Sequence, residues 1–184
     1  MKNIAILLLS FIVFLSCSST PSPQNTQEEV IISDTIPPRN QQIIDTIIKY
    51  GPQISPTYKK AVCTELIIPI IEKFYKLNKT DKSRIRIITQ DDIQQLLKQD
   101  SPVPKGVYYA LTEKGIGEPI DDIKKVLPGD LVQFWTETWG HCGIVKNIDI
   151  KQQVIEMYSS FPSTDGYGIQ RFRIPENCFF VRMK

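Results

Sequence analysis

The chain has 184 residues, and its formal net charge is only +2. Proteins that bind nucleic acid need a concentrated basic surface, whereas the lysines and arginines here are interspersed with acidic residues. We therefore expect no nucleic-acid partner. The length suits one domain with its own hydrophobic core and a terminal extension, and we expect that domain to be a monomer.

The first residues have the pattern of a bacterial signal peptide. Lys2 precedes an uncharged run over 4–15, and Ser16 and Cys17 follow. The run is shorter than the roughly 20 apolar residues that cross a bilayer. Ser16-Cys17 resembles the lipobox of bacterial lipoproteins, which implies that Cys17 is lipidated. We therefore expect secretion across the inner membrane and a lipid anchor that faces the periplasm or the cell surface, with ordinary signal cleavage as the alternative.

Three parts of the chain differ in composition. Residues 1–17 form the signal peptide and the lipobox cysteine. Residues 18–40 are rich in Ser, Thr, Pro, Gln and Glu, which predicts a flexible tether. Residues 41–184 are long enough to bury a core, so we expect one folded domain there.

Apolar residues recur at helical spacing in the first half of this domain. A first amphipathic helix that stops at Tyr50-Gly51-Pro52 is predicted by four isoleucines, Ile43, Ile44, Ile47 and Ile48. A longer apolar stripe predicts a central helix from Cys63 to Phe74. Pro69 lies inside that stripe and predicts either a kink or an earlier end, because proline lacks the backbone donor.

Shorter elements follow the central helix. The range 84–88 is rich in β-forming residues and is read as extended. Thr89 and the acidic residues after it predict the start of a short helix that ends near Lys98. Another short helix is predicted over 106–114.

The second half of the domain has the pattern of a sheet. Helices followed by strands with short links indicate an α+β fold, with N-terminal helices packed on an antiparallel sheet of about five strands. The predicted strands are 131–135, 141–148, 154–158, 167–174 and 178–182.

One cysteine and the single histidine form a candidate pair. Cys63 stands near the start of the central helix, where the helix dipole and unpaired N–H groups favour a thiolate. His141 begins a predicted strand, and glycines on both sides leave room for another element. Singly, each residue is more often structural. Together they have the arrangement that a cysteine nucleophile and its base need.

Three segments together resemble the NlpC and CHAP group of papain-like cysteine hydrolases. In that group a helix-borne cysteine precedes a Pro-Gly-Asp strand entry and a His-x-Gly/Ala-Ile-Val strand. The corresponding segments here, within about 58–182, are Ala61-Val62-Cys63-Thr64-Glu65-Leu66, Leu127-Pro128-Gly129-Asp130-Leu131-Val132-Gln133-Phe134 and Gly140-His141-Cys142-Gly143-Ile144-Val145. The Asp before the cysteine and the Ser-Gly after it, which many members carry, are missing. The resemblance implies a papain-like fold, Cys63 as nucleophile and His141 as base.

The family also implies a third residue that orients the imidazole from the next strand. A tight turn near 148–149 would place Glu156 opposite His141, so Glu156 is the candidate. A longer turn would move the opposite position towards Tyr158 or Ser160. The alternative for Glu156 is an ordinary charge that faces solvent.

The remaining candidates concern substrate, turns and metals. Trp139, Trp135 and Tyr158 are the expected substrate-binding residues, although core packing would explain one of the tryptophans. Asp130 is expected to form a turn. A metal site is not expected, because strand neighbours such as His141 and Cys142 point to opposite faces. Cys142 is expected to be buried, with a bond to Cys178 left open.

These observations favour an enzyme without cofactors. We expect Cys63 and His141 to cleave an amide bond in peptidoglycan stem peptides through a thioester. The expected partners are a peptidoglycan or peptide substrate and a membrane, which the lipid anchor contacts. The alternatives are an inactive papain-like lipoprotein that binds cell-wall fragments and an acyltransferase that uses the same two residues.

Overall fold

The computed structural model describes residues 35–184. The predicted signal peptide, Cys17 and most of the predicted tether lie outside these residues. Within 35–184, none of the helices has the length and hydrophobicity needed to cross a membrane.

Helix α1 spans Pro38–Ile54 and is longer at both ends than the sequence predicts. Its first turn includes Asn40, which is completely buried, so the folded domain begins before residue 41. At the other end, Gly51 and Pro52 do not stop the helix. The ring of Tyr167 lies where a side chain on Gly51 would be, so this glycine serves close packing rather than termination.

Helix α2 spans Cys63–Ile71 and ends two residues after Pro69. The predicted apolar stripe is buried, with Leu66, Ile67 and Ile70 almost inaccessible to solvent. The earlier end that Pro69 allowed is therefore confirmed, because Pro69 cannot donate to the carbonyl four residues back and its ring crowds that carbonyl.

Helix α3 spans Lys79–Arg86, and the extended segment predicted over 84–88 is wrong. The side chain of Asn78 accepts from the Asp81 N–H, and the Asp81 carboxylate accepts from the Asn78 N–H. This capping box starts a helix that local β-forming residues do not prevent. Helix α4 (Ile93–Lys98) ends where predicted but begins after Asp92, which caps it in place of Thr89. The other elements are α5 (Gly106–Glu113), close to its predicted range, and the short 3-10 segments η1 (Val103–Lys105), η2 (Ile123–Lys125) and η3 (Pro162–Thr164).

The sheet has six antiparallel strands in the order β1-β6-β2-β3-β4-β5. The five predicted strands are present, and the sequence missed β1, a short edge strand in which Pro119 is tolerated. The α+β architecture is confirmed. The strands are β1 (Gly117–Ile120), β2 (Leu131–Trp135), β3 (Gly140–Asp149), β4 (Val154–Phe161), β5 (Gly166–Arg173) and β6 (Asn177–Met183).

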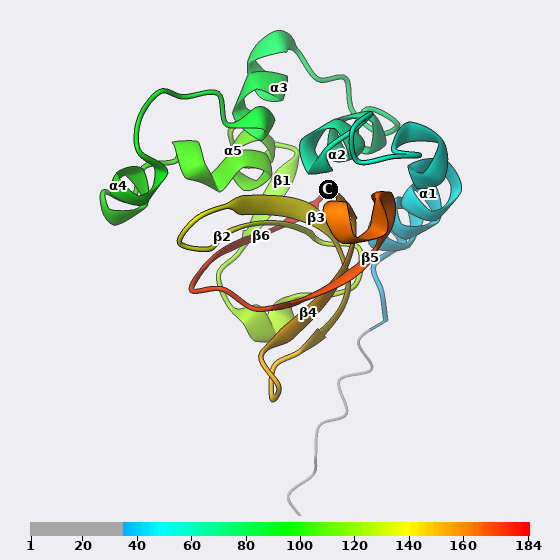
Figure 1. The fold of residues 1–184 in the computed structure, drawn as a ribbon. Helices are drawn as coiled ribbons and strands as arrows, with labels where there is room; N and C mark the ends of the chain where they lie inside the picture. The colour runs from blue at the N-terminus through cyan, green and yellow to red at the C-terminus, as the bar shows by residue number, and fades with distance from the viewer. Residues whose placement is uncertain (1–34) are drawn as a thin grey trace, which may run out of the picture. The chain divides into compact units, whose positions relative to one another are not determined.

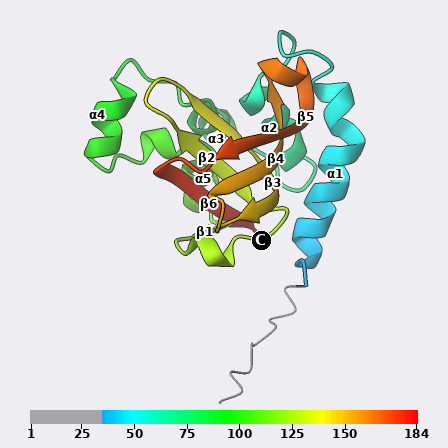
Figure 2. The same cartoon turned by 60° about the horizontal axis from the view of Figure 1, so that its bottom comes forward.

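The two faces of the sheet carry separate cores. The larger core lies between the helices and the sheet and includes the α1 and α2 isoleucines and Cys142. Figure 1 shows the helices gathered along one side of the curled sheet, and Figure 2 shows α1 beside the β5 edge. The smaller core covers the other face and is built around Phe134, Met157 and Phe180. The element that joins the two cores is the sheet itself.

The β3–β4 hairpin is irregular. Ile144 lies opposite Tyr158, but Asn147 lies opposite Glu156, so β3 contains one extra residue, a bulge between Val145 and Asn147. The turn is longer than expected, since Asp149 pairs with Val154. The register at His141 therefore differs from that of a tight, regular hairpin.

Asp130 holds the entry to β2 to the rest of the domain. Its buried carboxylate accepts two hydrogen bonds from Arg182, each 2.8 Å, and one from Asn40 at 2.8 Å. It also accepts from the backbone N–H of Leu127 at 2.7 Å, which closes the Pro-Gly-Asp turn. Asp130 is thus a turn former, as predicted, and it also links α1 and β6 to this turn.

Candidate active site

Cys63 is the first residue of α2 and is partly exposed. The first hydrogen bond of the helix runs from the Leu66 N–H to the Val62 carbonyl, so the N–H groups of Cys63 and Thr64 precede it. N–H groups at this position are free to bind a negatively charged oxygen. Cys63 thus lies at the start of the helix, as the sequence predicts.

Two serines hold the loop that leads to Cys63. The hydroxyls of Ser55 and Ser160 lie 2.8 Å apart, and both contact the carbonyl oxygen of Ala61. Ser55 and Ser160 are almost inaccessible to solvent. Because buried hydroxyls with fixed partners restrict the backbone, this contact positions Ala61 two residues before the sulfur.

His141 lies in β3 and is only 3% exposed. Its imidazole is surrounded by aromatic rings with centroid distances of 5.0–6.2 Å. These rings belong to Phe134, Trp139, Phe161 and Phe172. The imidazole therefore has few directions in which it can meet a polar partner.

One polar partner is Ser159, whose hydroxyl lies 2.8 Å from His141 Nε2. The same hydroxyl donates to Gln170 Oε1, and Gln170 Nε2 donates to Thr164 Oγ1 at 2.7 Å. Thr164 in turn donates to the Gly166 carbonyl at 2.7 Å. Each group in this chain uses its proton toward the next one, so the direction of the hydrogen bonds is determined.

This direction fixes the state of the imidazole. The Ser159 hydroxyl donates its proton to Gln170, so its oxygen can only accept a hydrogen bond from His141. His141 must therefore carry a proton on Nε2. A neutral His141 therefore has an unprotonated Nδ1, which is the nitrogen left for Cys63. A base that faces the sulfur is the state that nucleophile activation needs.

The surroundings of Cys63 favour its thiolate. The hydrogen bond from the Cys142 thiol is the largest cause that lowers the pKa of Cys63 well below its usual range, and hydrogen bonding and charge from His141 add to it. Burial acts in the opposite direction, and the backbone N–H of Cys142 lowers the pKa further. The pKa of Cys142 is raised well above its usual range, because this thiol donates to Cys63 and is fully buried.

Tyr58 is a neighbour of Cys63 that the sequence did not single out. Its pKa is raised, first by burial and then by the negative charge of Cys63. Its backbone N–H donates to the Asp165 carboxylate at 3.2 Å, which ties the loop before α2 to the turn between β4 and β5. The phenol thus stays protonated and supplies a hydrogen-bond donor near the sulfur.

The expected place of Glu156 is wrong. Glu156 lies opposite Asn147 in β3 and Arg171 in β5, and its carboxylate is 3.1 Å from the Lys146 amine. The longer turn and the bulge move it several positions away from His141. The side chain of β4 that hydrogen-bonds to the imidazole is Ser159, which lies between Tyr158 and Ser160, the two positions that the longer turn favoured.

The three expected substrate residues lie in different environments. Trp139 is 37% exposed and its ring centroid is 6.2 Å from that of His141. Trp135 donates from its indole N–H to the Pro104 carbonyl at 2.7 Å and packs against Gly140. Tyr158 is 8% exposed and belongs to the larger core. Of the three, Trp139 combines exposure with closeness to His141, whereas Trp135 and Tyr158 make the packing contacts described above.

Cys142 and Cys178 are not bonded to each other, and Cys63, Cys142 and Cys178 are all free. Cys142 belongs to the larger core and Cys178 packs against the smaller one, so the sheet separates them. The open option of a disulfide between them is therefore wrong. Burial raises the pKa of Cys178 to about 12, which leaves this thiol protonated and unreactive.

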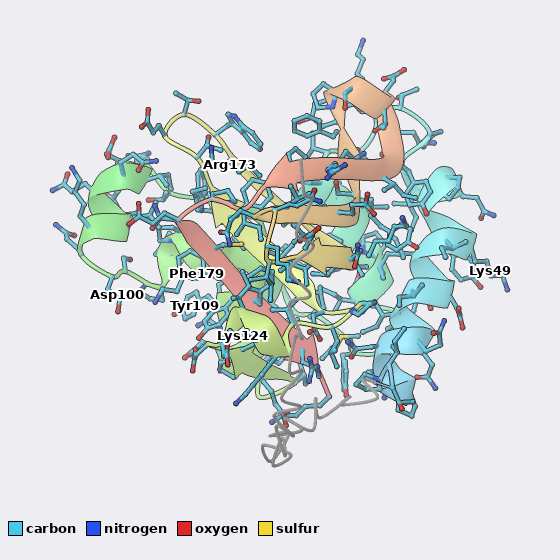
Figure 3. The ribbon with its side chains drawn as sticks, turned by 90° about the horizontal axis from the view of Figure 1, so that it is seen from below. Lys49, Asp100, Tyr109, Lys124, Arg173 and Phe179 are labelled. Carbon is cyan, nitrogen blue, oxygen red and sulfur yellow. The ribbon has the colours of Figure 1, made fainter. Side chains whose placement is uncertain are left out.

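A cavity of about 500 Å³ lies away from Cys63 and His141. Its lining includes Tyr108, Cys178 and Phe179, the last of which is labelled in Figure 3. No histidine lines it and its cysteine is protonated, so the chemistry of a nucleophile and a base is found at Cys63 and His141 instead. Among residues 35–184, no three His, Cys, Asp or Glu side chains are grouped to hold a metal ion.

Scans of protein-family models, of curated proteins and of solved structures find no match to this chain. The resemblance to the NlpC and CHAP group therefore stays a prediction that the residues around Cys63, Asp130 and His141 carry.

Proposed function

We propose that this protein is a cysteine hydrolase that cleaves an amide bond in cell-wall peptide. The observation that carries the proposal is the lowered pKa of Cys63, which begins α2, together with the hydrogen bond from His141 Nε2 to Ser159, which leaves Nδ1 as the nitrogen that can exchange a proton with the sulfur. A reactive thiolate beside an oriented base is the requirement for nucleophilic catalysis by cysteine.

In the proposed reaction, His141 Nδ1 first takes the proton of the Cys63 thiol, and the resulting thiolate then attacks the amide carbonyl and forms a tetrahedral intermediate. The Cys63 N–H at the start of α2 donates to the oxygen that becomes negative. His141 then gives its Nδ1 proton to the leaving amine, which leaves a thioester on Cys63. Water, deprotonated by His141, hydrolyses the thioester and regenerates the thiolate. Ser159 accepts from Nε2 in every step, so the ring does not need to turn.

The proposed substrate is a peptidoglycan stem peptide. Support comes from the resemblance to wall-acting hydrolases and from the predicted signal peptide, which would place the domain next to the cell wall. Trp139 offers an exposed aromatic face beside His141 on which a substrate can pack.

The test is release of new amino termini from purified peptidoglycan. We expect wild type to release them, and we expect Cys63→Ala or His141→Ala to abolish release. The double variant should be little worse than either single one, because residues that act as a unit are strongly non-additive. Cys178→Ala is the matched control and should keep full activity, since this thiol lies on the other face of the sheet.

Two outcomes would replace the proposal. If wild type releases nothing from several wall types but still binds them, the protein is a binding module. The interaction between Cys63 and His141 counts against that alternative, because a binding module would not need it. The acyltransferase alternative gains support from the aromatic surroundings of His141, because an apolar setting limits access of water. Transfer of the acyl group to an added amine or alcohol in preference to water would favour it.

For the location, we propose a lipid-anchored protein outside the cytoplasm. Cys17→Ser should release the protein into the soluble extracytoplasmic fraction and leave the domain folded. A folded domain is expected because the described part of the domain, residues 35–184, forms both cores without Cys17. Retention of the variant in the membrane fraction would contradict the anchor.

A further inference from the structure

Cys142 is a buried thiol that the proposed reaction does not use. It is 0% exposed and belongs to the larger core, and Cys63 packs against the same core from the start of α2. Cys63, by contrast, is partly exposed and accessible to small molecules. The structure therefore pairs an accessible sulfur with a protected one.

Cys63 and Cys142 are neighbours where α2 packs against β3, and both contact the larger core. The side chain and the backbone N–H of Cys142 both lower the pKa of Cys63, which requires them to lie close to its sulfur. A disulfide requires sulfurs that can meet with their side chains directed at each other. Here α2 and β3 bring the two cysteines to the same side of the sheet, whereas Cys178 packs against the core on the other side.

We infer that Cys63 and Cys142 form a reversible disulfide when the protein meets a hydroperoxide, with Cys63 as the oxidised thiol and Cys142 as the resolving one. The inference concerns the thiols themselves and rests on the proposed function only for its effect on hydrolysis. While the bond lasts, Cys63 cannot attack a carbonyl, and it is also protected from irreversible oxidation.

The disulfide between Cys63 and Cys142 forms in two steps. The Cys63 thiolate attacks one oxygen of the hydroperoxide, the O–O bond breaks, and the departing oxygen takes a proton and leaves as water or alcohol. Cys63 is now a sulfenic acid, because its sulfur has lost two electrons to the hydroperoxide. The Cys142 sulfur then attacks the sulfenic sulfur, the S–O bond breaks, and the hydroxyl leaves as water with the Cys142 proton.

Return to the reduced state needs a dithiol. The dithiol attacks the sulfur of Cys63, since Cys142 is inaccessible, and forms a mixed disulfide that its second thiol resolves. Secretion, which the N-terminal sequence predicts, would place the pair in a compartment where disulfides persist. A reversible bond would then keep the nucleophile recoverable.

The experiment treats the full chain with hydrogen peroxide, follows intact mass, and then adds dithiothreitol and measures alkylation of Cys63. Wild type should lose the mass of two hydrogens, give a peptide that links Cys63 to Cys142, and recover almost all alkylation. Cys142→Ala should instead gain two or three oxygens on Cys63 and recover little. Cys178→Ala, the control, should behave as wild type does.

Several results would overturn the inference. They are addition of oxygens to wild type without loss of hydrogens, a linked peptide that contains Cys178, or equal recovery of Cys142→Ala and wild type. Peptide mapping of wild type needs no variant, so the inference can still be tested if Cys142→Ala does not fold. None of these readouts uses cell-wall substrate, so the proposed hydrolase can fail while the disulfide forms, and the reverse.

Discussion

Ser159 and Ser160 are consecutive residues of β4, and one contacts His141 while the other contacts the loop before Cys63. Ser159 accepts a hydrogen bond from His141, while Ser160 contacts the Ala61 carbonyl in the loop that leads to Cys63. Because successive side chains of a strand point to opposite faces, one strand reaches both elements. β4 therefore sets the position of the sulfur relative to the imidazole, although it supplies neither.

The first prediction separates Ser159 from Glu156. Ser159→Ala should lower the rate of amide cleavage, because His141 loses the partner of Nε2. The loss is bounded by the roughly 10²–10⁴-fold that a general acid contributes. Glu156→Gln should leave the rate unchanged, since Glu156 only pairs with Lys146. Turnover of the two variants on one substrate decides it, and a larger loss for Glu156→Gln would contradict the assignment of Ser159.

The second prediction concerns the proton on the imidazole. Gln170→Leu removes the acceptor of Ser159, so its hydroxyl can turn and donate to Nε2, which moves the proton of neutral His141 to Nδ1. The chain has one histidine, so a single ring appears in a ¹⁵N NMR spectrum. Measured with Cys63→Ala as background and a neutral ring, the parent should show Nε2–H and the Leu variant Nδ1–H.

Gln170→Glu is the control for this experiment, because it keeps an acceptor oxygen for Ser159. It should retain the Nε2–H form. If Gln170→Leu also retains that form, Gln170 does not determine the proton position, and the hydrogen bond to Ser159 is only structural.

The third prediction concerns pH. Cys63 has a lowered pKa, so its alkylation by iodoacetamide should stay fast as pH falls below about 8.5, the value of a free thiol, and should slow only as pH passes the folded pKa. The same lowered pKa stabilises the folded state above the unfolded pKa, and this contribution is lost as pH falls through the folded one.

Mass spectrometry of the alkylated native protein supplies the control. Cys142 and Cys178 have raised pKa values and should label far more slowly than Cys63 at neutral pH. Equal labelling of the three thiols, or Cys178 first, would count against Cys63 as the nucleophile.

The fourth prediction concerns stability. Arg182→Leu leaves the Asp130 carboxylate buried without its cation, which should lower the free energy of unfolding by about 3–5 kcal/mol. Arg171→Leu is the control, because Arg171 is exposed and bonds only to Gln152, and it should stay within about 0.5 kcal/mol of wild type. Urea denaturation measures the free energy of unfolding of both variants. Equal losses would show that the buried Arg182–Asp130 pair stabilises the fold no more than an exposed arginine does.

Much of the fold could be predicted from local patterns. The stripe after Cys63, the strands after Pro128 and the Asp130 turn are determined by spacing and turn chemistry that the structure preserves. Errors arose where a short signal outweighed composition, as in the capping box of Asn78 and Asp81. The edge strand around Pro119 was missed because proline argues against strands in general.

The site was only partly predictable for a different reason. Cys63 and His141 stand at element starts, where sequence position and chemistry coincide. Ser159 and Gln170 reach His141 through strand pairing, which depends on turn length and on the bulge in β3. No sequence pattern next to Ser159 indicates that it contacts His141. The closeness of Cys63 to Cys142 depends on how α2 lies against the sheet.

The extra residue of β3 also sets which of the two serines faces the imidazole. Counted from Ile144 and Tyr158, Gly143 falls opposite Ser159, on the face that carries His141. Counted from Asn147 and Glu156 as though β3 were regular, Gly143 would fall opposite Ser160 instead. The bulge thus shifts the pairing of β3 with β4 by one residue, which exchanges the two faces of β4. Without this shift the Ser159 hydroxyl would point away from the imidazole. His141 would keep its place in the strand, but no hydrogen bond to Ser159 would determine which of its nitrogens carries the proton.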